Sequence, residues 1–269
     1  MIEPTLSPAQ WRGLDLGTRV VGYHEHDAIL YALAVGARAA DLDLVFEDRL
    51  RVLPTFALTL AQWAPDVLGA FGAFDTETTL HGSQSLDILS PLPRSGEITM
   101  SAHVGEVWDK GLAAVFEIVV ESDYFVATWS LFAPGAGGFG GNRGPSAPPT
   151  PGQEPTAVGT LITGADQAAL YRLTGDRHHI HIDPDAAERI GQPRPILHGM
   201  CTLAATTLPL ADMLGAHPAD LKALAGRFAA PVFPGDSAQL RAWGAATNSR
   251  FDVTTAGGAV LSGGRAVFA

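Results

Sequence analysis

The feature that most constrains the fold of this 269-residue chain is a long internal repeat. Two short motifs occur once in each half of the chain, in the same order: Leu-Tyr-x-Leu at 30–33 and 170–173, and Thr-Leu-Ala at 59–61 and 202–204. The separation of Tyr31 from Pro91 equals that of Tyr171 from Pro231. A repeat of this length indicates a duplicated domain, because solenoid repeats span only about 20–50 residues.

A stretch rich in Gly and Pro divides the two copies. Because residues 134–160 hold too few apolar side chains for a core, we expect a linker there, an N-terminal domain over 1–133 and a C-terminal domain over 161–269. In both halves helix-like runs come before strands. The strands expected in the first half are 76–80, 96–103, 112–121 and 124–132. Helices against antiparallel strands, twice over, predict the α+β class.

The segment Tyr171–His181, Tyr-Arg-Leu-Thr-Gly-Asp-Arg-His-His-Ile-His, carries the clearest chemistry. It follows a helix-like run, and Asp183 and Pro184 after it are typical of the N-cap and first residue of a new helix. Asp176 and His181 would then lie on one short loop and could share one water, as general acid–base chemistry requires. The alternative is that Asp176 caps a helix and His181 is a surface histidine.

A second segment, Arg194–Leu208, reads as a tight approach followed by a largely apolar helix. Gly199 would lie near the N-terminus of that helix, where backbone N–H groups are free and the helix dipole favours negative charge. Having no side chain, Gly199 would let a substrate oxygen approach the backbone closely. The pattern suggests chemistry in which a carbonyl becomes an oxyanion. Pro209 is expected to kink or end the helix.

These two segments resemble the MaoC-like dehydratases, the (R)-specific enoyl-CoA hydratases also called hydratase 2. The family pattern is roughly Tyr-x-x-Ser/Thr-Gly-Asp-x-Asn-Pro-x-His, followed by Ile-Leu-His-Gly. It matches at 171–181 and 196–199, except that His178 and His179 replace Asn-Pro. Segments at 27–37, 52–56, 81–86 and 133–141 are also similar to the two-domain members of the family.

The resemblance implies two tandem hot-dog domains, each a central helix wrapped by an antiparallel sheet, with one active site formed by the C-terminal domain. The implied reaction is reversible hydration of a trans-2-enoyl-CoA to the (R)-3-hydroxyacyl-CoA. We expect a bulky or long acyl chain from fatty-acid or steroid side-chain β-oxidation, and no cofactor. We assign catalysis to Asp176, His181 and Gly199.

Five further residues are candidates for substrate binding: His178, His198, Arg194, Arg227 and Phe56. The two arginines could hold the phosphates of CoA. Phe56 stands opposite Gly199 when the two halves are aligned, and Asp41 or Leu42 stands opposite His181. Because the N-terminal copy therefore lacks the acid–base pair, we expect it to accommodate the acyl chain.

Other functions stay open at this point. The same Asp–His pair could direct water at the carbonyl of an acyl-CoA thioesterase, or the altered His178–His179 loop could belong to a non-catalytic acyl-thioester binding protein. The histidines at 178, 179 and 181, with Asp176 and Asp183, suggest a metal site less strongly, since no second cluster matches them, and we expect none. Gly135–Gly140 fits the dinucleotide pattern GxGxxG, but Pro-rich sequence follows it where a helix would be needed.

Composition restricts the partners. A formal net charge of −11 argues against nucleic acid, because phosphate binding needs a basic field. The chain has no apolar stretch of about eighteen residues, so we expect no membrane span, and the polar start Met1–Thr5 lacks a secretory signal. A single cysteine, Cys201, fits a reducing compartment, so we expect a cytoplasmic enzyme. Since hot-dog folds commonly pair, a homodimer is also expected.

Overall fold

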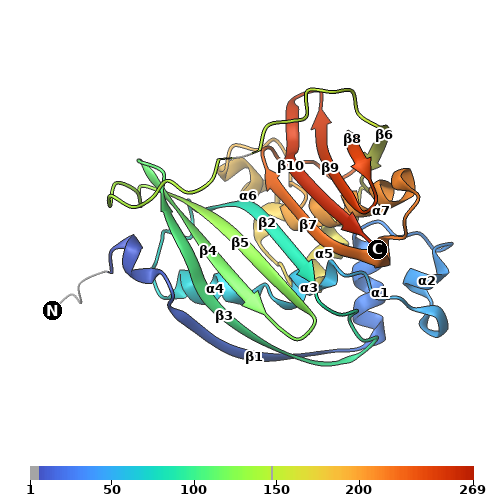
Figure 1. The fold of residues 1–269 in the computed structure, drawn as a ribbon, viewed down its shortest axis with the longest axis horizontal. Helices are drawn as coiled ribbons and strands as arrows, with labels where there is room; N and C mark the ends of the chain where they lie inside the picture. Colours follow the sequence, from blue (N-terminus) through green and yellow to red (C-terminus); the bar gives the residue numbers. More distant parts are fainter. Residues whose placement is uncertain (1–5, 147) are drawn as a thin grey trace.

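The sheet of the protein is a single antiparallel layer. The computed structural model describes residues 6–146 and 148–269, so the start of the chain discussed above lies outside the described residues. The strands follow the order β1-β3-β4-β5-β2-β7-β10-β9-β8-β6 across the sheet (Figure 1). Their bounds are β1 Asp15–Tyr23, β2 Leu80–Ile88, β3 Gly96–Asp109, β4 Ala113–Glu121, β5 Phe125–Pro134, β6 Ala157–Ile162, β7 Leu221–Phe228, β8 Ser237–Ala245, β9 Asn248–Thr255 and β10 Gly258–Phe268.

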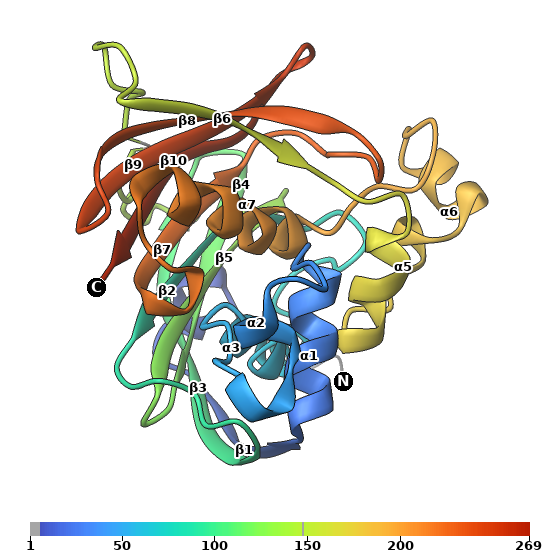
Figure 2. The ribbon, with the colours of Figure 1, turned by 90° about the vertical axis from the view of Figure 1, so that its right-hand side faces the viewer.

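The helices gather on one side of this curved sheet (Figure 2). They are α1 Glu25–Ala34, α2 Leu42–Val45, α3 Phe56–Leu60, α4 Trp63–Ala70, α5 Gln167–Tyr171, α6 Pro184–Arg189 and α7 Gly199–Leu214. Short 3-10 turns include η3 Arg172–Thr174, η4 His179–His181 and η5 Pro218–Asp220. In the part of the chain that the structure describes, no helix combines the length and apolarity needed to cross a bilayer.

The duplication is visible in the strand order. Read outward from the centre, the first half runs β2-β5-β4-β3-β1 and the second half runs β7-β10-β9-β8-β6, so each strand has its counterpart at the same distance from the middle. The halves join where β2 pairs with β7, from Ser83 opposite Arg227 to Asp87 opposite Ala223. Helices against antiparallel strands in both halves confirm the α+β class. The boundaries at 133 and 161 stay a prediction, although β5 ends at Pro134 and β6 begins at Ala157.

The core lies between the sheet and the helices. Alternate side chains of β4 and β5, such as Phe116, Ile118 and Trp129, are buried, as the two-residue period of a strand requires for a sheet with one covered face. On the helix side α7 is buried nearly throughout its first half, where small residues such as Ala204 and Ala205 allow close packing. The site described below sits where α7 begins.

One expected strand was wrong, and so was one of the two alternatives for Pro209, the end of the helix. The strand expected at 76–80 is a turn, because the side chain of Asp75 accepts from the Glu77 N–H (2.9 Å) and its carbonyl accepts from the Thr79 N–H (3.1 Å). Pro209 does not end α7, which continues to Leu214. An interior proline costs about 3 kcal/mol, and the burial of α7 against the sheet offsets that cost.

Candidate active site

The acid–base loop begins with a glycine that no other residue replaces easily. After η3, Gly175 adopts φ +155°, in the left-handed range that favours glycine. A Cβ there would meet Thr59 Cγ2 at 3.4 Å and Gln62 Oε1 at 3.7 Å, so the loop lies against α3 and α4 of the N-terminal half. The carboxylate of the next residue, Asp176, accepts from the backbone N–H of His178 at 3.0 Å. Glycine thus turns the chain and the turn fixes the carboxylate.

The His178–His179 replacement leaves this loop braced. The imidazole of His178 is exposed, and its Nδ1 accepts from the backbone N–H of Ile180 at 3.4 Å, which caps η4. Farther on, Asp183 Oδ1 accepts from the Asp185 N–H at 3.0 Å and α6 begins at Pro184, as the sequence predicts. A histidine can therefore supply the local hydrogen bonds that hold the loop between two helical turns.

His181 is held as one tautomer. Its Nδ1 lies 2.8 Å from the carbonyl oxygen of Ile196, and because a carbonyl only accepts, Nδ1 carries the hydrogen. In the neutral ring Nε2 then has the free lone pair. Burial lowers the pKa of His181, although the Ile196 carbonyl and the charge of Asp176 oppose the shift. The side chain is 8% exposed, so the alternative of a surface histidine is wrong.

Asp176, His181 and His198 come together at one point. One ligand-type atom from each, a carboxylate oxygen or an imidazole nitrogen, lies within 4.8 Å of the other two. A single water molecule can hydrogen-bond two groups at this separation. Among the described residues this is the group of side chains that could also approach a metal ion: Asp176 and His181 belong to the cluster considered from the sequence, and His198 joins them in place of its other members.

Gly199 is the first residue of α7, as expected, and His198 is its N-cap. The first amides of a helix have no partner within the helix, so they are free for a ligand oxygen. A Cβ at Gly199 would meet the ring of Phe228 at 3.1 Å, tighter than ordinary contact. Glycine at this position therefore leaves room for the ring of Phe228 beside the start of α7.

A cavity of about 200 Å³ adjoins the loop and extends into the N-terminal half. Leu173 and Thr174, just before Gly175, form one part of its wall; the other lining residues belong to the N-terminal half: Val21, Gly22, Tyr23, Asp27, Leu30, Phe56, Thr59 and Leu60. Phe56 is the first residue of α3, so it occupies the place in its own half that Gly199 occupies in the second. Its buried ring packs against Tyr23 and Tyr31, each with ring centroids 5.1 Å from it.

The two arginines do not meet the acid–base pair. Arg194 is held by Asp236 (2.7 Å) and the Pro234 carbonyl (3.0 Å), with its guanidinium over the ring of Phe233. Arg227 is exposed on β7, and since neighbouring side chains alternate, it points to the opposite face of the sheet from Phe228.

Arg227 has cationic neighbours there. Together with burial, Arg227 and Arg143 lower the pKa of Lys110. Lys110 follows β3 and Arg143 follows β5, so three cations from different segments interact through their charges.

His81 of β2 was not among the residues expected at the site. Its ring packs on Phe228 at 4.7 Å, and its buried Nε2 has no hydrogen-bond partner among the described residues. Burial lowers the pKa of His81 to about 4, so the ring is neutral at pH 7. Its place in a segment similar to the two-domain members was the available signal. Its position beside Phe228 depends on the β2–β7 pairing, which no local pattern predicts.

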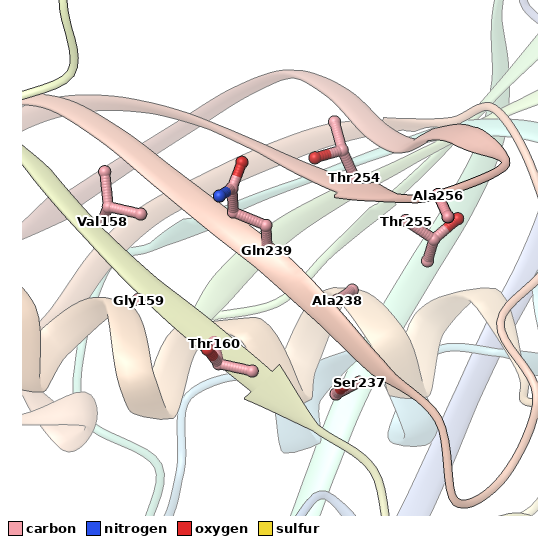
Figure 3. A pocket seen from close by; sticks show the side chains of 9 residues that line it. All are labelled: Val158, Gly159, Thr160, Ser237, Ala238, Gln239, Thr254, Thr255 and Ala256. Carbon is pink, nitrogen blue, oxygen red and sulfur yellow. The ribbon is translucent and has the colours of Figure 1, made fainter.

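A larger hollow, of about 500 Å³, lies far from these groups, on the outer face of β6, β8 and β9 (Figure 3). It is lined by Val158, Gly159, Thr160, Ser237, Ala238, Gln239, Thr254, Thr255 and Ala256. No side chain in this lining is titratable, and the hollow is shallow. Size alone therefore does not locate the chemistry.

Comparison with known proteins agrees with the geometry. The chain matches the model of the MaoC like domain over residues 146–262 and that of the MFE-2 hydratase 2 N-terminal domain over 22–127. It is 37% identical to "3-hydroxyacyl-thioester dehydratase Y" of Mycobacterium tuberculosis, covering 81% of each chain. It is 36% identical to "Enoyl-CoA hydratase ChsH3" of the same organism, covering 81% of this chain and 82% of that one.

The solved MaoC-like dehydratase of Phytophthora capsici superposes with a TM-score of 0.84 at 26% identity, and the match covers 96% of each chain. The expected fold, two tandem hot-dog domains, is confirmed by such neighbours. The N-terminal match ends at residue 127 and the C-terminal match begins at residue 146. Residues 128–145 between them overlap the first part of the Gly/Pro-rich stretch 134–160.

Proposed function

Because the chain belongs to the family of MaoC-like dehydratases, we propose that it is a hydro-lyase that adds water reversibly to a trans-2-enoyl-CoA and forms the (R)-3-hydroxyacyl-CoA. The observation that carries the proposal is the meeting of the Asp176 carboxylate and the His181 imidazole within 4.8 Å, beside the N-terminus of α7. Those groups suit a reaction in which one water is activated while a carbonyl gains negative charge.

The acid–base pair would carry one proton through the reaction. As the water oxygen bonds to C3, the pair accepts a proton from that water; as C2 gains electron density, the pair returns a proton to C2 on the same face. The free Nε2 of His181 and the carboxylate of Asp176 can both hold the proton, so the two groups titrate as a pair. No net proton enters or leaves, as the balance of hydration requires.

The amide of Gly199 would hold the thioester oxygen. Electron density moves onto this oxygen when water adds at C3, and a donor aimed at it stabilises the enolate-like transition state. Removing one such donor commonly costs about 2.7–4 kcal/mol of barrier. The position of Gly199 at the start of α7 supports this role, because the helix dipole adds to the attraction.

The acyl chain would enter the cavity beside Thr174. A volume of about 200 Å³ is below the roughly 300–1,000 Å³ of typical ligand pockets. A long or bulky chain, as the sequence suggests, would therefore fill this cavity and displace part of its wall. Phe56, the largest apolar side chain in the lining, is the residue whose size would limit the chain.

The proposal includes no metal and no redox cofactor, since proton transfer and one oxyanion donor suffice for the reaction. Acyl-CoA is the partner, and the candidates for contact with CoA phosphates are the half-buried Lys110 and the exposed Arg143 and Arg227. A cytoplasmic location and a homodimer belong to the proposal as well. The free, buried Cys201 supports the former, because nothing in the chain depends on an oxidising compartment.

The test follows the conjugated-thioester absorbance after the protein is added to trans-2-enoyl-CoAs from short to steroid-derived chains. Free thiol is assayed in parallel, with and without EDTA. Loss of absorbance without thiol release, unaffected by EDTA, is the expected result. Thiol release would instead establish a thioesterase. Binding of the acyl-CoA without turnover would establish a non-catalytic acyl-thioester binding protein. Chiral analysis of the product decides between the (R) and (S) alcohol.

Two substitutions test the assignment of the pair. Asp176→Asn and His181→Ala should each lower kcat about 10²–10⁴-fold, the usual contribution of a positioned acid or base. The far-UV circular dichroism should be unchanged, because both residues lie on the segment between α5 and α6 and outside the sheet and α7. His179→Ala, on the same loop but exposed, is the matched control and should retain activity. Wild-type rates in either site variant would contradict the assignment.

A further inference from the structure

One buried side chain contacts both members of the acid–base pair. His198, the residue before α7, is 1% exposed. Its ring stacks on that of His181, with centroids 3.6 Å apart and planes 26° apart. Its Nε2 lies 3.2 Å from the backbone carbonyl oxygen of Asp176, and since that oxygen only accepts, Nε2 donates. His198 therefore fixes the ring of one partner and the backbone of the other.

The ring of His198 is itself held on the remaining sides. Tyr171 covers it with a ring centroid 4.8 Å away. The backbone carbonyl of His198 accepts from the Thr202 N–H (2.9 Å) and the Thr202 hydroxyl (3.1 Å), which fixes His198 on the first turn of α7. Because the next residue is Gly199, the same first turn positions the amide that faces the thioester oxygen.

The neutral state of the His198 ring is compatible with its stacking on His181. With Nε2–H donating, Nδ1 carries the lone pair, and this buried atom has no partner among the described residues. Burial, followed by the neighbouring His181, lowers the pKa of His198 to about 3. The ring therefore stays neutral where the enzyme works. A cation stacked at this distance would oppose every proton that His181 receives.

We propose that His198 is a positioning residue rather than a substrate-binding residue: it fixes Asp176, His181 and the amide of Gly199 relative to one another. The inference rests on the proposed function, because these three groups are the ones that the hydration uses. It differs from the role expected from the sequence, where His198 was placed in contact with substrate. Little of its surface remains for a ligand once His181, Tyr171 and Asp176 are in contact with it.

Two variants separate the contributions of the ring. His198→Phe keeps a stacked ring and loses the donor to Asp176, whereas His198→Gln keeps a donor and loses the stack. Each should lower kcat on the order of 10²-fold, the effect of a misplacement of about 1 Å. The inhibition constant of the saturated acyl-CoA of the same length should stay within about twofold. Cys201→Ala, buried in the same helix, is the control and should retain kcat.

A second readout needs no substrate. The ring ¹H–¹⁵N spectrum of His181 should show a single Nδ1–H tautomer in the wild type and a mixture in His198→Gln, because an unstacked ring can rotate away from Ile196. Unchanged kcat in both variants would overturn the inference, as would a raised inhibition constant with kcat retained. If the wild type turns over no enoyl-CoA, the proposed function fails, and the His181 spectrum alone decides the positioning role.

Discussion

At the scale of single residues, the contacts of His181 decide which chemistry it can do. Its Nδ1–H is used by the Ile196 carbonyl, so the ring presents Nε2 to the site. Burial favours the neutral form, which can accept a proton from water. The carboxylate of Asp176 is in turn fixed by the N–H of His178. The replacement of the family's Asn-Pro by two histidines therefore preserves the pair and adds a titratable ring beside it.

This arrangement predicts the pH at which kcat/KM falls on the acid side of its pH profile (the acid limb). The pKa of His181 is lowered from its ordinary value of about 6.5, and kcat/KM falls as the ring becomes protonated, so the limb should lie below pH 6.5. The charge of His178 contributes to the lowering. In His178→Ala the limb should therefore move to higher pH, whereas in His179→Ala it should not. A limb above pH 6.5 in the wild type would contradict the assignment of His181.

Gly199→Ala tests the proposed approach of the thioester oxygen to the amide of residue 199. The variant keeps the N–H but places a Cβ 3.1 Å from Phe228. We expect kcat/KM to fall about 10²-fold, as for other displacements of the reacting atoms. Stability should change little, because alanine is the better helix former by about 1 kcal/mol and offsets the crowding. Gly152→Ala, in open space, is the control in steady-state kinetics and thermal unfolding. Full activity in Gly199→Ala would rule out a close approach of the thioester oxygen to the amide of residue 199.

At the scale of elements, the glycines of the linker bind a carboxylate of the protein itself. Asp109, at the end of β3, accepts from the N–H groups of Gly111 (2.8 Å), Gly138 (3.0 Å) and Gly140 (2.8 Å). A Cβ at Gly137 would lie 2.4 Å from the Gly111 carbonyl oxygen. The GxGxxG pattern thus wraps a turn of the first domain, and this explains its resemblance to a phosphate-binding loop.

Asp109→Asn should loosen this connection. The hydrogen bond from Gly138, followed by that from Gly111, lowers the pKa of Asp109 to about 2. A lowered carboxyl pKa stabilises the fold above the unfolded value of about 3.9, and the contribution is lost as pH falls toward 2. Limited proteolysis at neutral pH should cut the Asp109→Asn variant faster than the wild type within 135–146, and acid should make the wild type equally sensitive. Asp123→Asn, in an exposed turn, should behave as the wild type.

At the scale of the whole molecule, residues of both halves surround the candidate active site. The catalytic loop packs on Thr59 and Gln62, and the cavity beside it is lined mostly by the N-terminal half. The rings of Tyr31 and Tyr171, the equivalent tyrosines of the two copies, lie 6.1 Å apart where α1 meets α5. A domain that has lost the acid–base pair therefore still shapes the site.

Separation of the halves should abolish activity. Residues 146–269 alone would expose the whole edge of β7, which pairs with β2 in the full chain, and an unpaired edge strand associates readily. We expect this fragment to aggregate or dimerise, with activity restored only when the first half is added. Sedimentation and the hydration assay provide the measurement. A monomeric, active fragment would show that the N-terminal half is dispensable.

Local sequence was sufficient to predict the repeat of the fold, several helix boundaries and the loop that carries Asp176 and His181. The repeat predicts two copies of one plan, glycine and proline mark Gly175 and Pro184 as helix boundaries, and Gly199 at the start of a helix follows from the apolar run after it. These features depend on neighbours a few residues apart, where backbone preferences dominate. The position of Asp176 and His181 on one loop follows for the same reason.

Tertiary structure decided what surrounds those groups. The stack of His198 on His181, the contact of Gln62 with Gly175 and the place of His81 beside Phe228 join residues from distant parts of the chain. Such contacts depend on strand pairing and helix packing, which local patterns do not encode. Asp75 shows the same limit on a smaller scale, since side-chain hydrogen bonds made a turn where β propensity favoured a strand. Sequence thus determined the reacting groups, and packing determined their arrangement.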